Sequence, residues 1–124
     1  FTGDMSIQGE ERLLQYMQDT KTKSVSSPLS PINLLKVAHH GSKTSSSESF
    51  LQAMNLRWAV ISCKEDNSYG HPHKEVTDRL KNQKITTLMT QTSGALLLES
   101  DGREIRFDTC IDGPDFSQYN KNQE

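Results

Sequence analysis

Ile32-Asn33-Leu34-Leu35-Lys36-Val37-Ala38 leads directly into His39-His40-Gly41-Ser42, and this stretch decides how the chain folds. A run rich in Ile, Leu and Val between Pro31 and Gly41 predicts a buried strand over residues 32–38. The glycine permits a sharp turn where that strand ends. Ligand sites of layered α/β folds form at the carboxyl ends of strands, so the two histidines stand where a site is expected. Because adjacent strand residues point to opposite faces, we expect one of the two to face that site.

The rest of the chain alternates helical and extended patterns. Apolar spacing predicts helices over residues 8–18, 46–54 and 73–82, and strands over 57–62, 85–90, 95–99 and 103–108. Ser45, with Glu48 three residues later, is a capping-box pattern for the second helix. Asp101-Gly102 between apolar residues favours a two-residue hairpin. The order predicts an α/β fold, with a mixed sheet, helices mainly on one face and a C-terminal hairpin.

Polar segments separate these elements. The Ser- and Pro-rich residues 19–31 predict a loop, residues 91–94 a turn, and residues 111–124 a disordered polar tail. The chain opens on Phe1 without an initiator methionine, and we expect it to be a piece of a longer protein. Cys63 and Cys110 show no CxxC spacing, so neither a zinc framework nor a disulfide scaffold is expected.

Composition limits the functions that the chain can have. Its 124 residues suffice for one domain with a modest core, or for part of a larger domain. The net charge of -2, from 14 Lys plus Arg against 16 Asp plus Glu, excludes a global basic field for nucleic acid. Any contact with DNA must therefore be local. No apolar run approaches the roughly 20 residues of a membrane-spanning helix.

Three polar clusters each lie just past the end of an expected strand, the first of them past a strand that Phe1 suggests in a longer parent chain. They are Thr2-Gly3-Asp4, His39-His40-Gly41-Ser42, and Asn67-Ser68-Tyr69-Gly70-His71-Pro72-His73. One carboxylate and two to four imidazoles at one sheet edge have the composition of a metal site. Structural roles are the alternatives. Asp4 can cap the first helix, and His71 can shape the turn before the third helix.

Other polar and aromatic residues have weaker functional readings. Ser42 to Ser45 form either a solvated lead-in or a phosphate contact at a helix N-terminus. We expect Trp58 and Tyr69 to pack in the core and the loop rather than to stack on bases.

Taken in order, these motifs resemble the metallo-β-lactamase-like domain at the C-terminus of the ComEC family, bacterial competence proteins that form a DNA-uptake channel. The resemblance covers roughly residues 1–100. It rests on the following segments: Phe1-Thr2-Gly3-Asp4, Leu35 to Ser45, Ala59-Val60-Ile61-Ser62, Asn67 to His73 and the Ser93-Gly94-Ala95 turn. It implies that residues 1–110 form the second half of an αββα sandwich that carries a two-metal site.

The family pattern also implies a role for each candidate residue. Asp4 matches the carboxylate that bridges the metals, and His40 matches the histidine that completes the second metal's shell. His39 then faces the substrate, or the two histidines exchange roles. His71 lines the mouth of the site, which makes His39 and His71 the catalytic candidates. His73 is the weakest candidate.

The HxHxDH motif, which supplies most metal ligands in the family, is absent from this chain. We therefore expect the intact domain to hold two divalent ions, zinc or manganese, and this chain alone to hold none or one weakly. Asp4 and His40 are too few for two shells of about four ligands each.

The resemblance implies a protein of the cell membrane that takes part in DNA uptake, with this domain on the extracellular side. The intact domain is expected to hydrolyse DNA phosphodiesters, and the chain alone to be inactive. The alternatives are a non-catalytic DNA-handling or interaction module, and another hydrolase such as a phosphorylcholine-esterase-like enzyme. The expected partners are DNA, the missing first half of the domain, and a second copy bound through an exposed sheet face.

Overall fold

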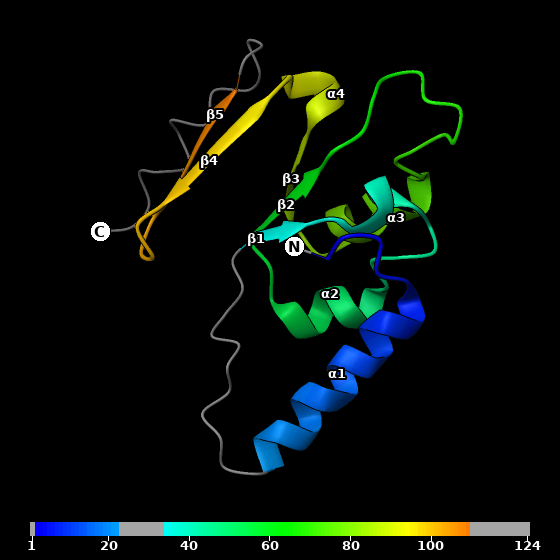
Figure 1. Ribbon diagram of the computed structural model, residues 1–124, viewed down its shortest axis with the longest axis vertical. Coiled ribbons are helices and arrows are strands. Elements are labelled where there is room, and N and C mark those ends of the chain that lie inside the picture. Colours follow the sequence, from blue (N-terminus) through cyan, green and yellow to red (C-terminus); the bar gives the residue numbers. More distant parts are fainter. Residues whose placement is uncertain (1, 23–33, 110–124) are drawn as a thin grey trace.

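The computed structural model describes residues 2–22 and 34–109 of the chain. Two strand–helix–strand units build its centre (Figure 1). Strands β1 (Leu34–Lys36), β2 (Trp58–Ile61) and β3 (Thr86–Met89) pair in parallel in the order β1-β2-β3. Helix α2 (Glu48–Met54) connects β1 to β2, and helix α3 (Lys74–Asn82) connects β2 to β3. Because the strands run in one direction, their carboxyl ends lie at the same edge of the sheet.

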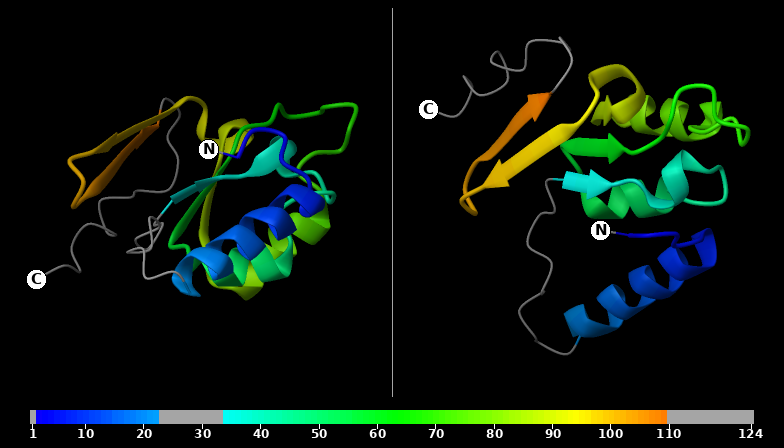
Figure 2. Two further views of the ribbon diagram at one scale, coloured as in Figure 1. Left: turned by 60° about the horizontal axis from the view of Figure 1, so that its bottom comes forward. Right: turned by 45° about the horizontal axis from the view of Figure 1, so that its top comes forward.

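The hydrophobic core lies between the sheet and the helices. Ala59 and Ile61 of β2 are fully buried, and they cluster with Leu51 of α2 and Leu80 of α3. Figure 2 shows α2, α3 and the first helix, α1 (Ile7–Thr22), on one side of the sheet, as the sequence predicted. Burying each aliphatic side chain stabilises the fold by about 1.5–3 kcal/mol, so this layer fixes the positions of the strand ends.

A separate hairpin covers part of the opposite face. Strands β4 (Leu96–Ser100) and β5 (Ile105–Thr109) pair antiparallel and follow the short helix α4 (Thr90–Ser93). The Phe107 ring centre lies 4.9 Å from that of Trp58, which points away from the helices because strand residues alternate. Trp58 and Leu88 are only 6% and 3% exposed. The face that was expected to be bare is therefore covered at these two residues.

Helix α1 (Ile7–Thr22) packs beside α2, with Leu13, Leu14 and Met17 against the core. Its first residue is tied to the loop after β1, because the Ile7 amide donates to the Thr44 carbonyl at 2.9 Å. The first turn of α1 thus lies against the segment that leads into α2.

Every predicted strand and helix has a counterpart, with differences in detail. The described strands form a parallel sheet and a separate hairpin, not one mixed sheet. The first helix runs on to Thr22, into residues expected to be a loop. Residues 90–93 form α4 within the expected turn. The cap of α2 is Ser47, whose hydroxyl accepts from the Phe50 amide, and not Ser45.

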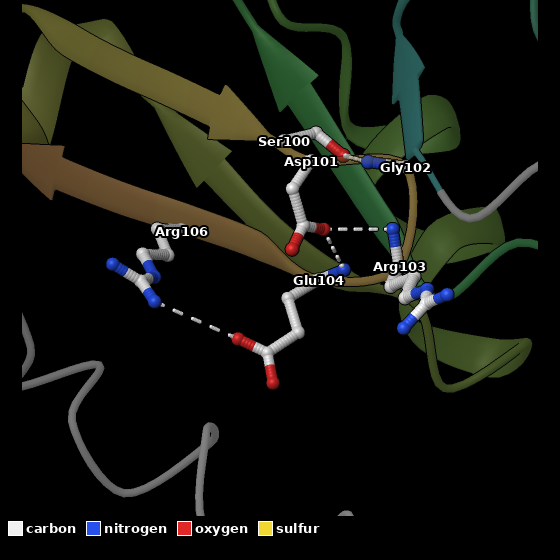
Figure 3. Close-up of polar contacts among 6 residues, drawn as sticks. All are labelled: Ser100, Asp101, Gly102, Arg103, Glu104 and Arg106. Carbon is white, nitrogen blue, oxygen red and sulfur yellow. Dashed lines mark hydrogen bonds and ion pairs between the residues drawn. The ribbon is translucent and has the colours of Figure 1, made fainter.

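The hairpin turn is also longer than Asp101-Gly102 predicted. Ser100 pairs with Ile105, which leaves the four residues 101–104 in the loop. The Asp101 carboxylate accepts from the amides of Arg103 and Glu104, both at 2.8 Å (Figure 3). These bonds hold the pKa of Asp101 below its usual range. An aspartate that accepts from the amides two and three residues further on therefore closes a wider loop here.

Some predictions fall outside the described residues. These are the disordered tail 111–124, the first two residues of the 32–38 strand, most of the 19–31 loop, and Cys110. Within residues 2–22 and 34–109, no helix has both the length and the apolar character needed to cross a membrane.

Candidate functional site

The N-terminal segment lies against the end of β1. The Thr2 hydroxyl donates to the Lys36 carbonyl at 2.8 Å, and the His39 amide donates to the Gly3 carbonyl at 2.9 Å. Asp4 follows directly and its side chain is exposed. The structure therefore brings Asp4 to the same sheet edge as the histidine pair, as the sequence predicted.

The histidine pair forms a strained turn. It lies in the short 3₁₀ segment η1 (Ala38–Gly41), where His39 and His40 have φ values of 47° and 55°. L-residues rarely adopt this left-handed conformation, which costs on the order of 1–3 kcal/mol per residue and is common at functional sites. Both histidines are exposed in this turn.

Gly41 allows two loops to meet. Its φ is +83°, and a Cβ built on it would lie 2.6 Å from the Pro72 Cβ. Its carbonyl accepts from the His73 amide at 2.9 Å. The loop after β2 therefore rests directly on the turn after β1, which is possible only because residue 41 has no side chain.

His40 has a defined tautomer. Its Nδ1 lies 2.6 Å from the Ser62 carbonyl, and because a carbonyl only accepts, Nδ1 must carry the proton. The lone pair of Nε2 is then free. A backbone carbonyl on one ring nitrogen is the usual support of a metal-binding histidine, so His40 is well prepared to be a ligand.

His73 has the opposite tautomer. Its Nδ1 accepts from the Lys43 amide at 3.1 Å, so in the neutral ring the proton is on Nε2. Neither nitrogen of His73 then offers a free lone pair. This geometry agrees with the sequence prediction that His73 is the weakest candidate.

His71 lies at the centre of the imidazoles. Its ring centre is 5.7 Å from that of His39, 6.5 Å from that of His40 and 4.8 Å from that of His73. Burial lowers the pKa of His71 below the ordinary 6.5, and the positive charge that the other three rings can carry lowers it further. The lowered pKa favours the neutral form of His71, which can accept a proton.

Asn67 holds the loop that carries His71. Its Oδ1 accepts from the His71 amide at 2.9 Å, and its Nδ2 donates to the carbonyls of Lys64 and His71. The Asn67 carbonyl also accepts from the Gly70 amide at 3.1 Å. The sequence pattern did not predict this role, although an asparagine that opens a polar loop is a known turn signal.

Glu10 and Arg79 hold the segment between the histidine turn and α2. Glu10 is fully buried, and its carboxylate accepts from the amides of Ser46 and Ser47. The Arg79 guanidinium donates to the carbonyls of Ser45 and Ser46. The amides at the start of α2 therefore already have an intramolecular anion, which weighs against the phosphate contact considered from sequence. No sequence signal marked Glu10, because its partners lie 36 and 37 positions away.

The candidate residues thus meet at one edge, but they do not complete a metal site. In the part of the chain that the structure describes, no group of three or more His, Cys, Asp or Glu side chains could hold a metal ion. Trp58 packs against Phe107, as the sequence predicted for a core residue. Tyr69, in contrast, is exposed.

Comparison with known proteins finds relatives of this sequence. Over 95 residues, 77% of this chain, it is 34% identical to ComE operon protein 3 of Bacillus subtilis (strain 168). Over an equal length it is 38% identical to Competence protein ComA of Neisseria gonorrhoeae. It is also 41% identical over 66 residues, 53% of this chain, to Recombination protein 2 of Haemophilus influenzae.

The chain spans only 11%, 12% and 8% of the lengths of these three relatives. No family model matches the chain, and no solved structure matches it significantly. The three relatives belong to one class, the bacterial competence proteins. Within that class, the chain is homologous to a part of the proteins of the ComEC family.

Proposed function

We propose that this chain is the second half of a metallo-β-lactamase-type domain, over residues 1–110, in a competence protein that takes up DNA. Its strand-end imidazoles would form part of a site that hydrolyses DNA phosphodiesters. The observation that carries the proposal is the Nδ1–H bond of His40 to the Ser62 carbonyl, which leaves the Nε2 lone pair of the neutral ring available. The His71 ring centre lies 6.5 Å from that of His40 and 5.7 Å from that of His39. The homology to competence proteins supports DNA as the substrate.

The donors fit a share of a metal site, not a whole one. Asp4 offers an exposed carboxylate and His40 a free Nε2, fewer than the roughly four ligands of one closed shell. Two zinc or manganese ions held jointly with the other half of the domain would activate water and stabilise the attacking and leaving oxygens. The described residues alone do not fit a two-metal site.

The chain's own residues have clear tasks in this proposal. His71, in its neutral form, accepts a proton from the attacking water, and its Asn67-bound backbone keeps the ring in place. His39, exposed and 5.7 Å from His71, faces the phosphodiester and donates a hydrogen bond to it. Gly41 keeps the two loops close enough for these rings to act together.

A second candidate is a DNA-handling module without catalysis. The described residues contain no group of three potential metal ligands, which fits a domain that kept the fold and lost turnover as well as it fits one half of a two-metal site. Such a module would bind DNA and leave it intact.

A DNA-cleavage assay separates the two candidates. It uses a domain in which a first half of the sandwich precedes this chain, with manganese or zinc and labelled DNA. If the domain is an enzyme, we expect it to cleave the DNA. Asp4→Ala and His40→Ala should each abolish cleavage, whereas His73→Ala should retain it. Binding without cleavage favours the module. Cleavage that persists in both Asp4→Ala and His40→Ala contradicts the proposed site.

The remaining proposals concern location and partners. We propose that the parent protein is embedded in the cell membrane, with this domain on the extracellular side. The missing half of the domain would cover the sheet face that carries half-buried Leu34 and Val60. A second copy can cover the same face when that half is absent, and light scattering of the chain tests this by its mass.

A further inference from the structure

Tyr69 is the most exposed large hydrophobic side chain of the described residues, at 76%. An isolated exposed aromatic is ordinary on a protein surface. Tyr69 differs by its position, because its ring centre lies 5.7 Å from that of His71 with the planes inclined by only 22°. The His71 ring in turn lies nearly parallel to that of His40, at 16°. The phenol therefore continues a stack of rings outward from the candidate site.

The loop fixes Tyr69 in this position. Tyr69 lies within the turn that the Gly70 amide closes on the Asn67 carbonyl at 3.1 Å. His71 lies two residues after Tyr69, and both its amide and its carbonyl bond to the Asn67 side chain. One face of the Tyr69 ring thus lies toward His71, while most of the tyrosine side chain is exposed to solvent. A ligand that stacks on the free face has little ordering cost to overcome.

The charges of the same loop favour an aromatic ligand over a purely ionic one. Lys64 is followed by Glu65 and Asp66, all exposed, and the chain as a whole has a net charge of -2. Such a surface supplies little of the phosphate attraction on which most DNA binding depends. Contact with the bases must then supply much of the affinity. Base stacking on aromatic side chains is the sequence-tolerant way to do so.

We propose that Tyr69 is a stacking platform for an unpaired base of single-stranded DNA, next to the His39–His40–His71 cluster. The proposal rests on the proposed function, since it takes DNA as the substrate. A base stacked on the free face of Tyr69 places its own backbone beside the imidazoles. Bases inside a duplex have both faces covered by neighbours, so the platform selects single strands.

Fluorescence anisotropy on the 124-residue chain tests the proposal. The probes are a labelled single-stranded oligothymidylate, an abasic oligonucleotide of the same length, and a duplex. The chain should bind the oligothymidylate about fivefold or more tighter than the abasic strand, the lower end of the range for one stacked base. Tyr69→Leu should remove this preference, and Tyr69→Phe should keep it. Tyr16→Leu, at the 62% exposed tyrosine of α1, is the matched control and should keep it too.

The outcomes distinguish this proposal from the one it rests on. If the wild-type chain binds oligothymidylate and abasic strand equally, or Tyr69→Leu keeps the preference, the platform is wrong and DNA remains the partner. If Tyr69→Phe loses as much as Tyr69→Leu, the hydroxyl acts rather than the ring, and stacking is wrong. If the chain binds none of the probes, DNA as the substrate is overturned together with the platform.

Discussion

Among the described residues, His40 and His73 each have a hydrogen-bond partner at Nδ1 and none at Nε2, yet the two Nε2 atoms have opposite chemistry. The Ser62 carbonyl forces the proton of His40 onto Nδ1, and the Lys43 amide forces that of His73 onto Nε2. The first ring can therefore bind a cation and the second cannot. Two backbone groups, not the identity of the residues, decide which histidine can offer a lone pair.

Nitrogen-15 NMR of the imidazoles at pH 7.5 tests this assignment directly. We expect the Nδ1–H tautomer for His40 and the Nε2–H tautomer for His73. Assignment of the two signals uses His40→Gln and His73→Gln. The Nε2–H tautomer at His40 would remove it as a metal ligand.

His71 should titrate below pH 6.5. Burial is the main cause, and the neighbouring His73, His39 and His40 add to the lowering of its pKa. Because the folded state binds this proton less readily than the unfolded state, the contribution of His71 to stability is complete above pH 6.5. It is lost as the pH falls from 6.5 through the lowered pKa. The ring proton shift of His71 measured against pH gives its pKa, and His73→Asn should raise it. A pKa at or above 6.5 contradicts the structure.

At the scale of elements, the site depends on how closely the loops after β1 and β2 approach. The two loops meet at Gly41 and Pro72, while Glu10 and Arg79 hold the segment that continues into α2. Helices α1 and α3 therefore support a turn to which neither contributes a candidate catalytic side chain. Measurements of stability can test the contact between Gly41 and Pro72 separately from the contacts of Glu10.

Gly41→Ala should destabilise the fold more than Gly102→Ala. Both glycines have positive φ, +83° and +86°, so each alanine carries a similar backbone strain, roughly 1–2 kcal/mol. The Cβ at position 41 also meets Pro72, whereas the one at position 102 meets nothing within 4 Å. We expect an additional loss of about 1–3 kcal/mol in the free energy of unfolding by urea. Equal losses in the two variants would show that the loops do not touch there.

Glu10→Ala should cost at least about 2 kcal/mol in the free energy of unfolding, because it leaves the amides of Ser46 and Ser47 without acceptors. Glu11→Ala is the control, since Glu11 is the exposed neighbour on the same helix and should change stability by less than about 0.5 kcal/mol. Glu10→Gln keeps one acceptor oxygen and should fall between the two. A loss in Glu10→Ala as small as that in Glu11→Ala contradicts the buried contact.

At the scale of the whole molecule, sequence predicted what depends on local pattern. Apolar spacing located the strands, and strand ends located Asp4, His39, His40 and His71 at one edge. The sequence could not predict the contacts of Glu10, because its partners lie far along the chain. It also could not decide between Ser45 and Ser47 as the cap of α2. The contact of the hairpin residue Phe107 with Trp58 was also not predicted, because no periodicity in the sequence indicates it. These contacts depend on tertiary packing.

The central claim is that this chain carries one part of a metal site, centred on Asp4 and His40. Calorimetric titration of the chain with zinc is the most direct test. The account predicts no more than one ion per chain, held more weakly than about 1 μM because Asp4 and His40 are too few for a closed shell. Any such binding should be weakened by His40→Ala and left unchanged by His73→Ala. Tight binding of two ions per chain, or weakening by His73→Ala and not by His40→Ala, would contradict it.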